Sequence, residues 1–159
     1  MNIRKAIIED FDKINELNWQ SDLYHYNNEP YIYEKTIEGH RTKEYIEEII
    51  NDENNLFVVM EMENEIIGFL YAYEEMKGKL LFHKKRKYMV LDNIVIKEKF
   101  QKMRYGYKLL EYLIEYSKEK HYNDIVLNVY CFNEKAIKLY ERNGFKKLSQ
   151  DMILKLWRK

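Results

Sequence analysis

The sequence contains few of the residues that cross-link a chain or interrupt its helices and strands. Among its 159 residues it has one cysteine, Cys131, one proline and five glycines. A lone cysteine cannot form a disulfide within the chain, so a reducing compartment is favoured and the expected location is cytoplasmic. No Pro-, Gly- or Ser-rich linker and no internal repeat interrupts the sequence. We therefore expect a single domain over residues 1–159.

Net charge and long apolar runs are also absent. Lys plus Arg and Asp plus Glu number 27 each, so no overall field attracts nucleic acid or an anionic membrane. No apolar run approaches the roughly 20 residues of a membrane span, and the N-terminus has no signal-peptide core. The basic run Lys84-Lys85-Arg86-Lys87 leaves nucleic-acid binding as a lesser alternative to a solvated loop. The histidines have no metal-ligand spacing with Cys131, so we expect no bound metal. For the reasons of charge and hydropathy given above, we also expect neither nucleic acid nor a membrane as a partner.

Apolar periodicity predicts an α/β domain with a mixed sheet. Alternation of apolar residues marks strands, and spacings of three and four mark helices. Asp10 and Thr42 stand where they can cap two helices, and Glu63-Asn64 suits a hairpin turn. The expected order is β-α-α-β-β-β-α-β-α-β-β. The strands are predicted at 3–7, 56–61, 65–73, 89–96, 125–130, 145–148 and 152–157, and the helices at 10–17, 42–50, 107–120 and 134–142.

A strand, a loop and a helix follow one another in the segment from Val90 to Lys120. The strand ends at Ile96, and the loop reads Gln101-Lys102-Met103-Arg104-Tyr105-Gly106. A tight loop that opens a helix directs several free backbone N–H groups toward one point, where the helix dipole also favours an anion. Gly106 lets a phosphate approach the backbone because it has no side chain.

A second motif lies farther along, in Asn133-x-x-Ala136-x-x-x-Tyr140-x-x-x-Gly144-Phe145. Asn133 begins a predicted helix, and Tyr140 lies two turns later on the same face, with Ala136 between them. By itself, Asn133 would be an N-cap and Tyr140 a core residue. A cap and a ligand contact are compatible for the same asparagine.

Together the two motifs resemble the signature of the GNAT superfamily, Gln/Arg-x-x-Gly-x-Gly/Ala followed by Asn-x-x-Ala-x-x-x-Tyr-x-x-x-Gly-Phe. The resemblance implies an acyl-CoA N-acyltransferase fold, with a mixed central sheet whose strands splay and are flanked by helices. It implies acetyl-CoA as cosubstrate and a primary amine of a small molecule or protein as acceptor. Dimers are common in this family, so a homodimer is left open. The alternative is a non-catalytic domain that binds or senses acetyl-CoA.

The resemblance also assigns roles to positions. The strand residues Ile94, Val95 and Ile96 are expected to meet the pantetheine arm, Asn133 and Ala136 to contact it, and Tyr140 to lie near the thioester sulfur. The pyrophosphate is expected on the N–H groups of Gln101, Lys102, Met103, Arg104, Tyr105, Gly106, Tyr107 and Lys108.

One position departs from the family pattern, because Arg104 replaces the first glycine of the loop. A positive φ at this residue would cost roughly 1–2 kcal/mol. We therefore expect Arg104 to adopt a helical or bridging conformation that keeps its N–H directed at the phosphate, with the guanidinium adding attraction.

Acetyl transfer to an amine requires removal of a proton, because a lysine-like amine has a pKa near 10.4. Asp92 is the candidate general base, and strand alternation predicts that it faces the same way as Ile94 and Ile96. A purely structural hydrogen-bonding role for Asp92 is an equal alternative. The N–H of Ile94 is a candidate for polarising the thioester carbonyl, and Tyr140 for protonating the leaving thiolate. His25, Tyr26 and Glu29 are placed near the acceptor by element order alone.

Overall fold

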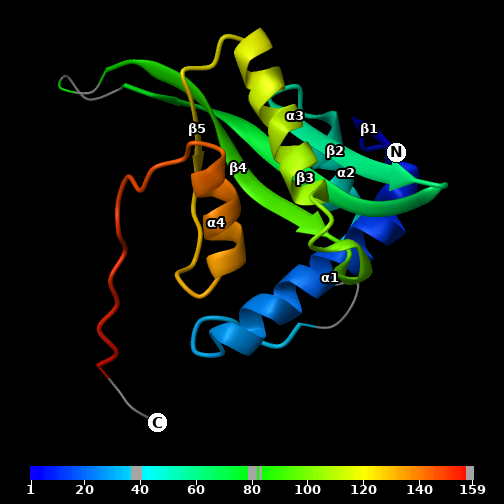
Figure 1. Ribbon diagram of the computed structural model, residues 1–159, viewed down its shortest axis with the longest axis horizontal. Helices are drawn as coiled ribbons and strands as arrows, with labels where there is room; N and C mark the ends of the chain where they lie inside the picture. The colour runs from blue at the N-terminus through cyan, green and yellow to red at the C-terminus, as the bar shows by residue number, and fades with distance from the viewer. Residues whose placement is uncertain (37–40, 79–81, 83, 157–159) are drawn as a thin grey trace. The chain divides into compact units, whose positions relative to one another are not determined.

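A computed structural model describes residues 1–36, 41–78, 82 and 84–156 (Figure 1). The chain divides into two compact units, Met1–Asn128 and Val129–Lys159, and each is described by itself. The second unit contains one helix, α4 (Glu134–Arg142), among its described residues. The first contains β1 (Asn2–Lys5), the short 3-10 helix η1 (Ile8–Asp10), α1 (Phe11–Asn28), α2 (Lys43–Asn51), β2 (Asn55–Met62), β3 (Glu65–Lys77), β4 (Arg86–Ile96), the 3-10 helix η2 (Glu98–Phe100), α3 (Tyr105–Glu119) and β5 (Asp124–Leu127).

The five strands form one mixed sheet in the order β1-β2-β3-β4-β5. Neighbours pair antiparallel except β4 and β5, which pair in parallel. The expected mixed sheet is thus confirmed. Between β2 and β3, Glu63 and Asn64 have φ values of 51° and 64°, the left-handed pair that a tight hairpin needs. This confirms the hairpin turn read from the sequence.

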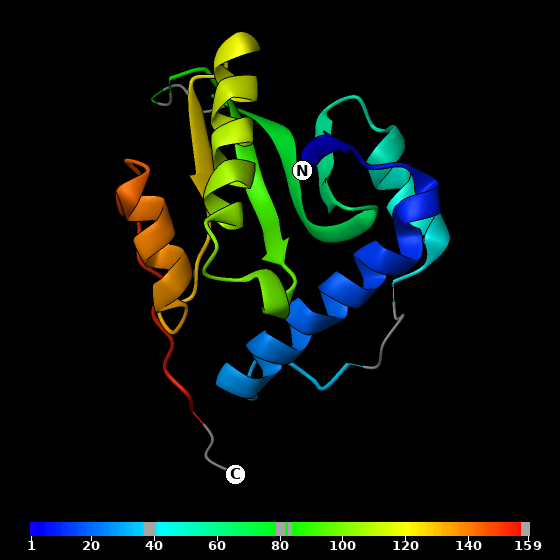
Figure 2. The ribbon, with the colours of Figure 1, turned by 45° about the vertical axis from the view of Figure 1, so that its right-hand side comes forward.

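Helices cover both faces of the sheet in the first unit (Figure 2). Alternate residues of β2 and β3, such as Phe57 and Phe69, belong to a core that also contains Ile14 and Leu17 of α1 and Ile46 of α2. The intervening strand residues face the other way, as strand geometry requires. Helix α3 supplies fully buried residues at the predicted helical spacing, Leu109, Leu110 and Leu113.

Local caps were predicted correctly for α2 but not for α1. The hydroxyl of Thr42 accepts a hydrogen bond from the N–H of Tyr45 at 3.2 Å, so Thr42 is the cap of α2. The prediction for Asp10 is wrong, because its side chain makes no cap bond to α1. Its carboxylate instead receives two hydrogen bonds from Arg4, at 2.7 and 2.9 Å, and one from the N–H of Ile7 at 3.0 Å. The hydrogen bonds to the carboxylate of Asp10 thus come from Arg4 in β1 and from Ile7 rather than from the first turn of α1.

The two closing strands predicted from the sequence are wrong over the described residues 145–156, which contain no strand. Their apolar side chains are largely exposed: Leu148 by 79%, Met152 by 90% and Leu154 by 82%. Trp157, the last residue of that prediction, lies outside the described residues. Apolar alternation indicates where a strand can form, but a strand also needs a paired edge, and this segment has none. No described helix is long and apolar enough to cross a membrane.

The pairing of Arg4 with Asp10 joins β1 to the start of α1, and its loss should destabilise the protein. Burial opposes ionisation of Asp10, but the hydrogen bonds from Arg4 and Ile7 outweigh it and hold the pKa of Asp10 below its usual value. Asp10→Asn should lower the free energy of unfolding by about 2–3 kcal/mol at pH 7. Since the folded pKa lies below the unfolded value near 3.9, this difference should persist above about pH 5 and shrink as the pH falls through the folded pKa.

Urea unfolding of both proteins between pH 3 and 7 measures this difference. Glu9→Gln, the loss of one exposed carboxylate beside Asp10, is the control and should change stability by less than about 0.5 kcal/mol. A loss for Asp10→Asn that stays constant down to pH 3 would contradict the assignment.

Candidate active site

The ladder between β4 and β5 stops half way along β4. Its last pair is Leu91 with Leu127, so residues 92–96 have a free backbone edge on the β5 side. On the β3 side the register shifts, because Tyr71 pairs with Asn93 while Ala72 pairs with Leu91. Asp92 is therefore the extra residue of a β-bulge, a feature that redirects a side chain.

Residues 94 and 96 present their backbone groups to this free edge. The N–H of Lys97 bonds to the carbonyl of Ile67 in β3 at 2.8 Å, and hydrogen-bonding direction alternates along a strand. Val95 therefore bonds toward β3, and its side chain is buried in the core that α1 and α2 cover. Ile94 and Ile96 fit the expected role of pairing with an extended amide arm, whereas Val95 does not.

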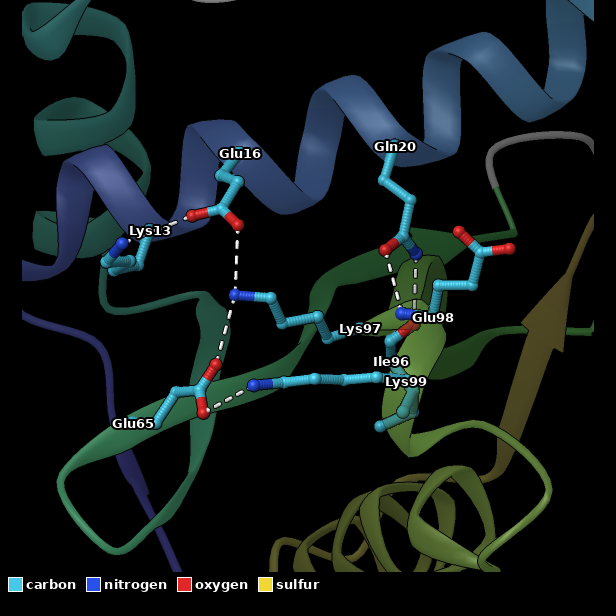
Figure 3. A network of polar contacts seen from close by, with 8 residues as sticks. All are labelled: Lys13, Glu16, Gln20, Glu65, Ile96, Lys97, Glu98 and Lys99. Atoms are coloured by element: carbon cyan, nitrogen blue, oxygen red, sulfur yellow. Dashed lines mark hydrogen bonds and ion pairs between the residues drawn. The ribbon is translucent and has the colours of Figure 1, made fainter.

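The carbonyl of Ile96 already has partners within the chain (Figure 3). The side-chain amide of Gln20 in α1 donates to this carbonyl at 3.0 Å and accepts from the N–H of Glu98 at 2.9 Å. The side chain of Gln101 donates to the same carbonyl at 3.1 Å. Sequence reasoning missed Gln20 because it lies 76 residues from Ile96. We call Gln20, Gln101, Ile96 and Glu98 the glutamine clamp.

An ion-pair network lies beside the glutamine clamp (Figure 3). The ammonium group of Lys97 lies 2.9 Å from a carboxylate oxygen of Glu16 in α1 and 3.0 Å from one of Glu65 in β3. Lys99 adds a second ion pair to Glu65 at 2.9 Å. Glu16 and Glu65 raise the pKa of Lys97 above its usual value, so this lysine stays charged. The turn that leaves β4 is therefore held from both α1 and β3.

The loop before α3 concentrates free hydrogen-bond donors. At its two ends the N–H groups are engaged: Gln101 donates to the carbonyl of Glu98 at 3.1 Å and Lys108 to that of Arg104 at 3.2 Å. These two N–H groups are therefore engaged within the chain, and their expected contact with a pyrophosphate stays a prediction. Between them, the N–H groups of residues 102–107 have no acceptor in the described part of the chain. Lys102 and Arg104 have φ values of 65° and 64°, and such alternation of backbone handedness forms a concave anion site.

The conformation expected for Arg104 is wrong, because this residue is left-handed, with φ 64° and ψ 11°. The turn into α3 requires this geometry, so Arg104 occupies a glycine-like position despite its Cβ, at a cost of about 1–2 kcal/mol. Its guanidinium lies 5.4 Å from the ring centre of Tyr107. This cation–π contact offsets part of the strain.

Asp92 faces a small cavity of about 80 Å³ on the side of α1 and α2. The predicted shared orientation with Ile94 and Ile96 is wrong, because the bulge turns Asp92 to the side of Asn93 and Tyr71. Burial raises the pKa of Asp92 above its usual value, and the positive charge of Arg41 opposes the rise. The cavity is lined by Asn18, Arg41, Tyr45, Ile46, Ile49, Phe57, Phe69, Tyr71, Asp92 and Asn93.

Within the described residues, Asp92 has no ion-pair or hydrogen-bond partner of its own. Arg41 is engaged elsewhere, since both its terminal nitrogens bond to Asp22 of α1, at 2.7 and 3.1 Å. This leaves a carboxylate with raised proton affinity in the wall of a cavity that solvent reaches, since Asp92 is an exposed residue. Such a group can act as a general base. His25 and Tyr26 lie in α1, Glu29 follows it, and none of the three lines this cavity.

In the second unit, α4 places the residues of the second motif on defined positions. The side-chain oxygen of Asn133 accepts from the N–H of Ala136 at 3.2 Å, so its N-cap role is confirmed. Its amide nitrogen has no hydrogen-bond partner among the residues that the structure describes. Tyr140 is buried, and burial raises its pKa to about 12. Its ring lies 5.7 Å from that of Phe145. Gly144 ends the helix with φ 88°, which is favourable for glycine.

The first unit thus combines an anion-binding loop, a free strand edge and a carboxylate in a cavity. The loop donors, with Lys102 and Arg104 beside them, suit a pyrophosphate, and the strand edge suits an extended amide chain. Among the described residues, no group of three or more His, Cys, Asp or Glu side chains is arranged to hold a metal ion.

Several solved structures share this fold over nearly the whole chain. A tetramutant of the BH1408 protein from Bacillus halodurans matches with TM-score 0.92 and 24% identity, over 98% of this chain and 100% of that one. The aminoglycoside acetyltransferase meta-AAC0020 from an uncultured soil metagenomic sample, in complex with sisomicin, matches with TM-score 0.71 and 16% identity, over 99% and 96%. A ribosomal-protein-alanine N-acetyltransferase from Brucella melitensis biovar Abortus 2308 matches with TM-score 0.68 and 16% identity, over 98% and 100%. At these identities the likeness concerns the fold alone.

The sequence itself provides the family assignment. The model of the acetyltransferase (GNAT) family matches residues 13–145, a range that includes the loop before α3 and the motif on α4. It also includes the bulge at Asp92 and the glutamine clamp. The chain therefore belongs to the GNAT family of acetyltransferases.

Proposed function

We propose that this protein is an N-acetyltransferase that moves the acetyl group of acetyl-CoA to a primary amine of a small molecule or protein. The observation that carries the proposal is the run of N–H groups at residues 102–107 without acceptors in the described chain, next to the free edge of β4. Such an arrangement suits a ligand with a pyrophosphate and an extended amide arm.

The residues that would hold acetyl-CoA follow from these groups. The N–H groups of residues 102–107 would bind the pyrophosphate, with the guanidinium of Arg104 adding charge. The carbonyl of Ile94 and the N–H of Ile96 would pair with the pantetheine arm. By the family resemblance, the amide nitrogen of Asn133 would bond to the same arm. When bound, acetyl-CoA supplies a thioester carbonyl that accepts an amine and releases a thiolate.

The proton transfers are assigned to two side chains. Asp92 accepts the proton that the amine must lose, and its raised pKa suits this task. By the family resemblance, Tyr140 would donate its phenolic proton to the leaving thiolate; its pKa of about 12 keeps it protonated at neutral pH. The N–H of Ile94 polarises the acetyl carbonyl. The new bond joins nitrogen to the acetyl carbon, and the carbon–sulfur bond breaks.

A second candidate function is a domain that binds acetyl-CoA without transferring the acetyl group. The replacement of the loop glycine by Arg104 is the observation that favours it. The cytoplasmic location, the lack of nucleic-acid and membrane partners, and a homodimer stay predictions.

The two functions differ in thiol release. We expect the purified protein to release CoA from acetyl-CoA in the presence of primary amines, and to bind acetyl-CoA in their absence. Calorimetry measures binding, and a thiol reagent measures release over a panel of small amines and lysine peptides. Binding without release on any amine would favour the sensor domain, and absence of binding would contradict both.

Substitutions at Asp92 and Tyr140 should have different effects on the pH profile. Asp92→Asn should lower kcat/KM by about 10²–10³ and remove the fall in activity at low pH, because an ionised Asp92 is the base. In the wild type, activity should fall as the pH drops through the raised pKa of Asp92. Tyr140→Phe should lower kcat at saturating acetyl-CoA and keep that acidic fall. An acidic fall that survives in Asp92→Asn would contradict the base role of Asp92, and an unchanged kcat in Tyr140→Phe would contradict the acid role of Tyr140.

Arg104→Gly should separate backbone strain from phosphate binding. Removing the Cβ at a left-handed residue should raise the free energy of unfolding by about 0.5–1 kcal/mol, after the greater freedom of unfolded glycine is subtracted. Loss of the guanidinium should weaken acetyl-CoA binding about three- to tenfold.

His121→Gly is the matched control for Arg104→Gly. His121 is also left-handed, with φ 57°, but it follows α3 at the end away from the loop. The control should gain similar stability and bind acetyl-CoA like the wild type. Unfolding curves and calorimetry measure the two quantities. Equal acetyl-CoA affinities for both variants would mean that Arg104 does not contact the phosphate.

A further inference from the structure

A larger hollow of about 490 Å³ opens beside the Asp92 cavity on the same face of the sheet. Tyr71 lines both spaces, so the two adjoin. The larger one, which we call the tyrosine hollow, is lined by Asp52, Asn54, Asn55, Tyr71, Tyr73, Glu74 and Met76. No residue in this set is basic. The function proposed above does not use this hollow.

The carboxylates of the tyrosine hollow differ in how far they are engaged. Glu74 accepts from the hydroxyl of Tyr122 at 2.6 Å and pairs with Lys87 at 2.9 Å, so its charge is balanced. Asp52 uses one oxygen to accept two bonds from Asn54, at 2.9 and 3.0 Å. No cation pairs with Asp52 among the described residues. Asp52 therefore leaves an uncompensated negative charge at this hollow.

Two tyrosine rings connect Asp52 to Asp92. The ring centres of Tyr71 and Tyr73 lie 6.1 Å apart, and neither hydroxyl has a hydrogen-bond partner in the described part of the chain. Burial first, and then the negative charge of Asp92, raise the pKa of Tyr71 to about 12, and Asp52 adds to this rise. The negative charges of Asp52 and Asp92 therefore both reach the hydroxyl of Tyr71. Neutral electron-rich rings next to carboxylates are the surroundings that bind an ammonium group.

We infer that the acceptor is a small dication, with its reacting amine at Asp92 and a second ammonium group in the tyrosine hollow. This inference rests on the proposed function, because it assigns the acceptor side of the same reaction. Asp52 supplies the countercharge, and the rings of Tyr71 and Tyr73 supply the cation–π surface. An acceptor with one amine fills only the Asp92 cavity. The second charge is therefore the determinant of specificity.

Acceptor pairs of equal length test the inference. With acetyl-CoA saturating, linear diamines of three to six carbons and the matching n-alkylamines are compared by thiol release, with a diaminosugar as a second dication. The kcat/KM of a diamine should exceed that of its monoamine about tenfold, the worth of one ammonium site at a partly exposed aromatic surface. Asp52→Asn should reduce this ratio below about threefold and leave the monoamine value unchanged.

Matched variants distinguish binding at the tyrosine hollow from a non-specific effect of removing one negative charge. Glu53→Gln removes the same charge from the adjacent residue, which does not line the hollow, and should keep the diamine preference. Tyr73→Phe should keep it and Tyr73→Leu should lose it, because the ring rather than the hydroxyl binds the cation. Equal rates for diamines and monoamines in the wild type, or a preference that survives Asp52→Asn, would overturn the inference.

A failure of the proposed acetyl transfer can be distinguished from a failure of the dication site. If no amine is acetylated, calorimetric titration of diamines and monoamines into the wild type and Asp52→Asn still tests the tyrosine hollow. Tighter binding of diamines to the wild type, lost in Asp52→Asn, would support the dication site without catalysis. Equal binding of both amine types would overturn it.

Discussion

The end of the β4–β5 ladder at Leu91 and Leu127 is the constraint on which the rest of the site depends. Beyond this pair, β3 is the only strand that pairs with β4 among the described residues, so the backbone groups of Ile94 and Ile96 lie on an edge with no neighbouring strand. The bulge at Asp92 lies at the same point and turns that carboxylate to the opposite face of the sheet. One interruption of regular pairing thus provides both a strand edge for an amide arm and a carboxylate in a cavity.

The glutamine clamp holds the end of this interrupted strand by hydrogen bonds. Strand ends without a ladder partner fray easily, but Gln20 bonds to groups on both sides of Lys97. The lysine itself is held between Glu16 and Glu65. Helix α1 therefore fixes the turn that leads to the donor loop, although α1 contributes no residue to that loop. The carbonyl of Ile96 is engaged as a result, so any ligand at this edge meets its N–H but competes for its carbonyl.

The loop before α3 shows how a strained residue is retained. Left-handed Arg104 costs free energy, but the turn directs the N–H groups of residues 102–107 outward and the guanidinium stacks on Tyr107. Strain of this kind is typical of ligand-binding segments, where the surrounding structure enforces it. The acceptor side has a different chemistry, with phenol rings and carboxylates rather than backbone donors. The loop after β4 thus suits an anion, and the face of the sheet at Asp92 suits a cation.

The sequence by itself determined the features that depend on residues three or four apart. The cap at Thr42 and the cap at Asn133 were readable because each interaction closes within one helical turn. The family signature likewise sits in two short stretches. The tertiary structure alone decided the bulge at Asp92, the partner of Asp10, and the bond from Gln20 to Ile96. It also decided the grouping of Asp52 with Tyr71 and Tyr73, because strand register and helix packing bring together residues that are remote in sequence.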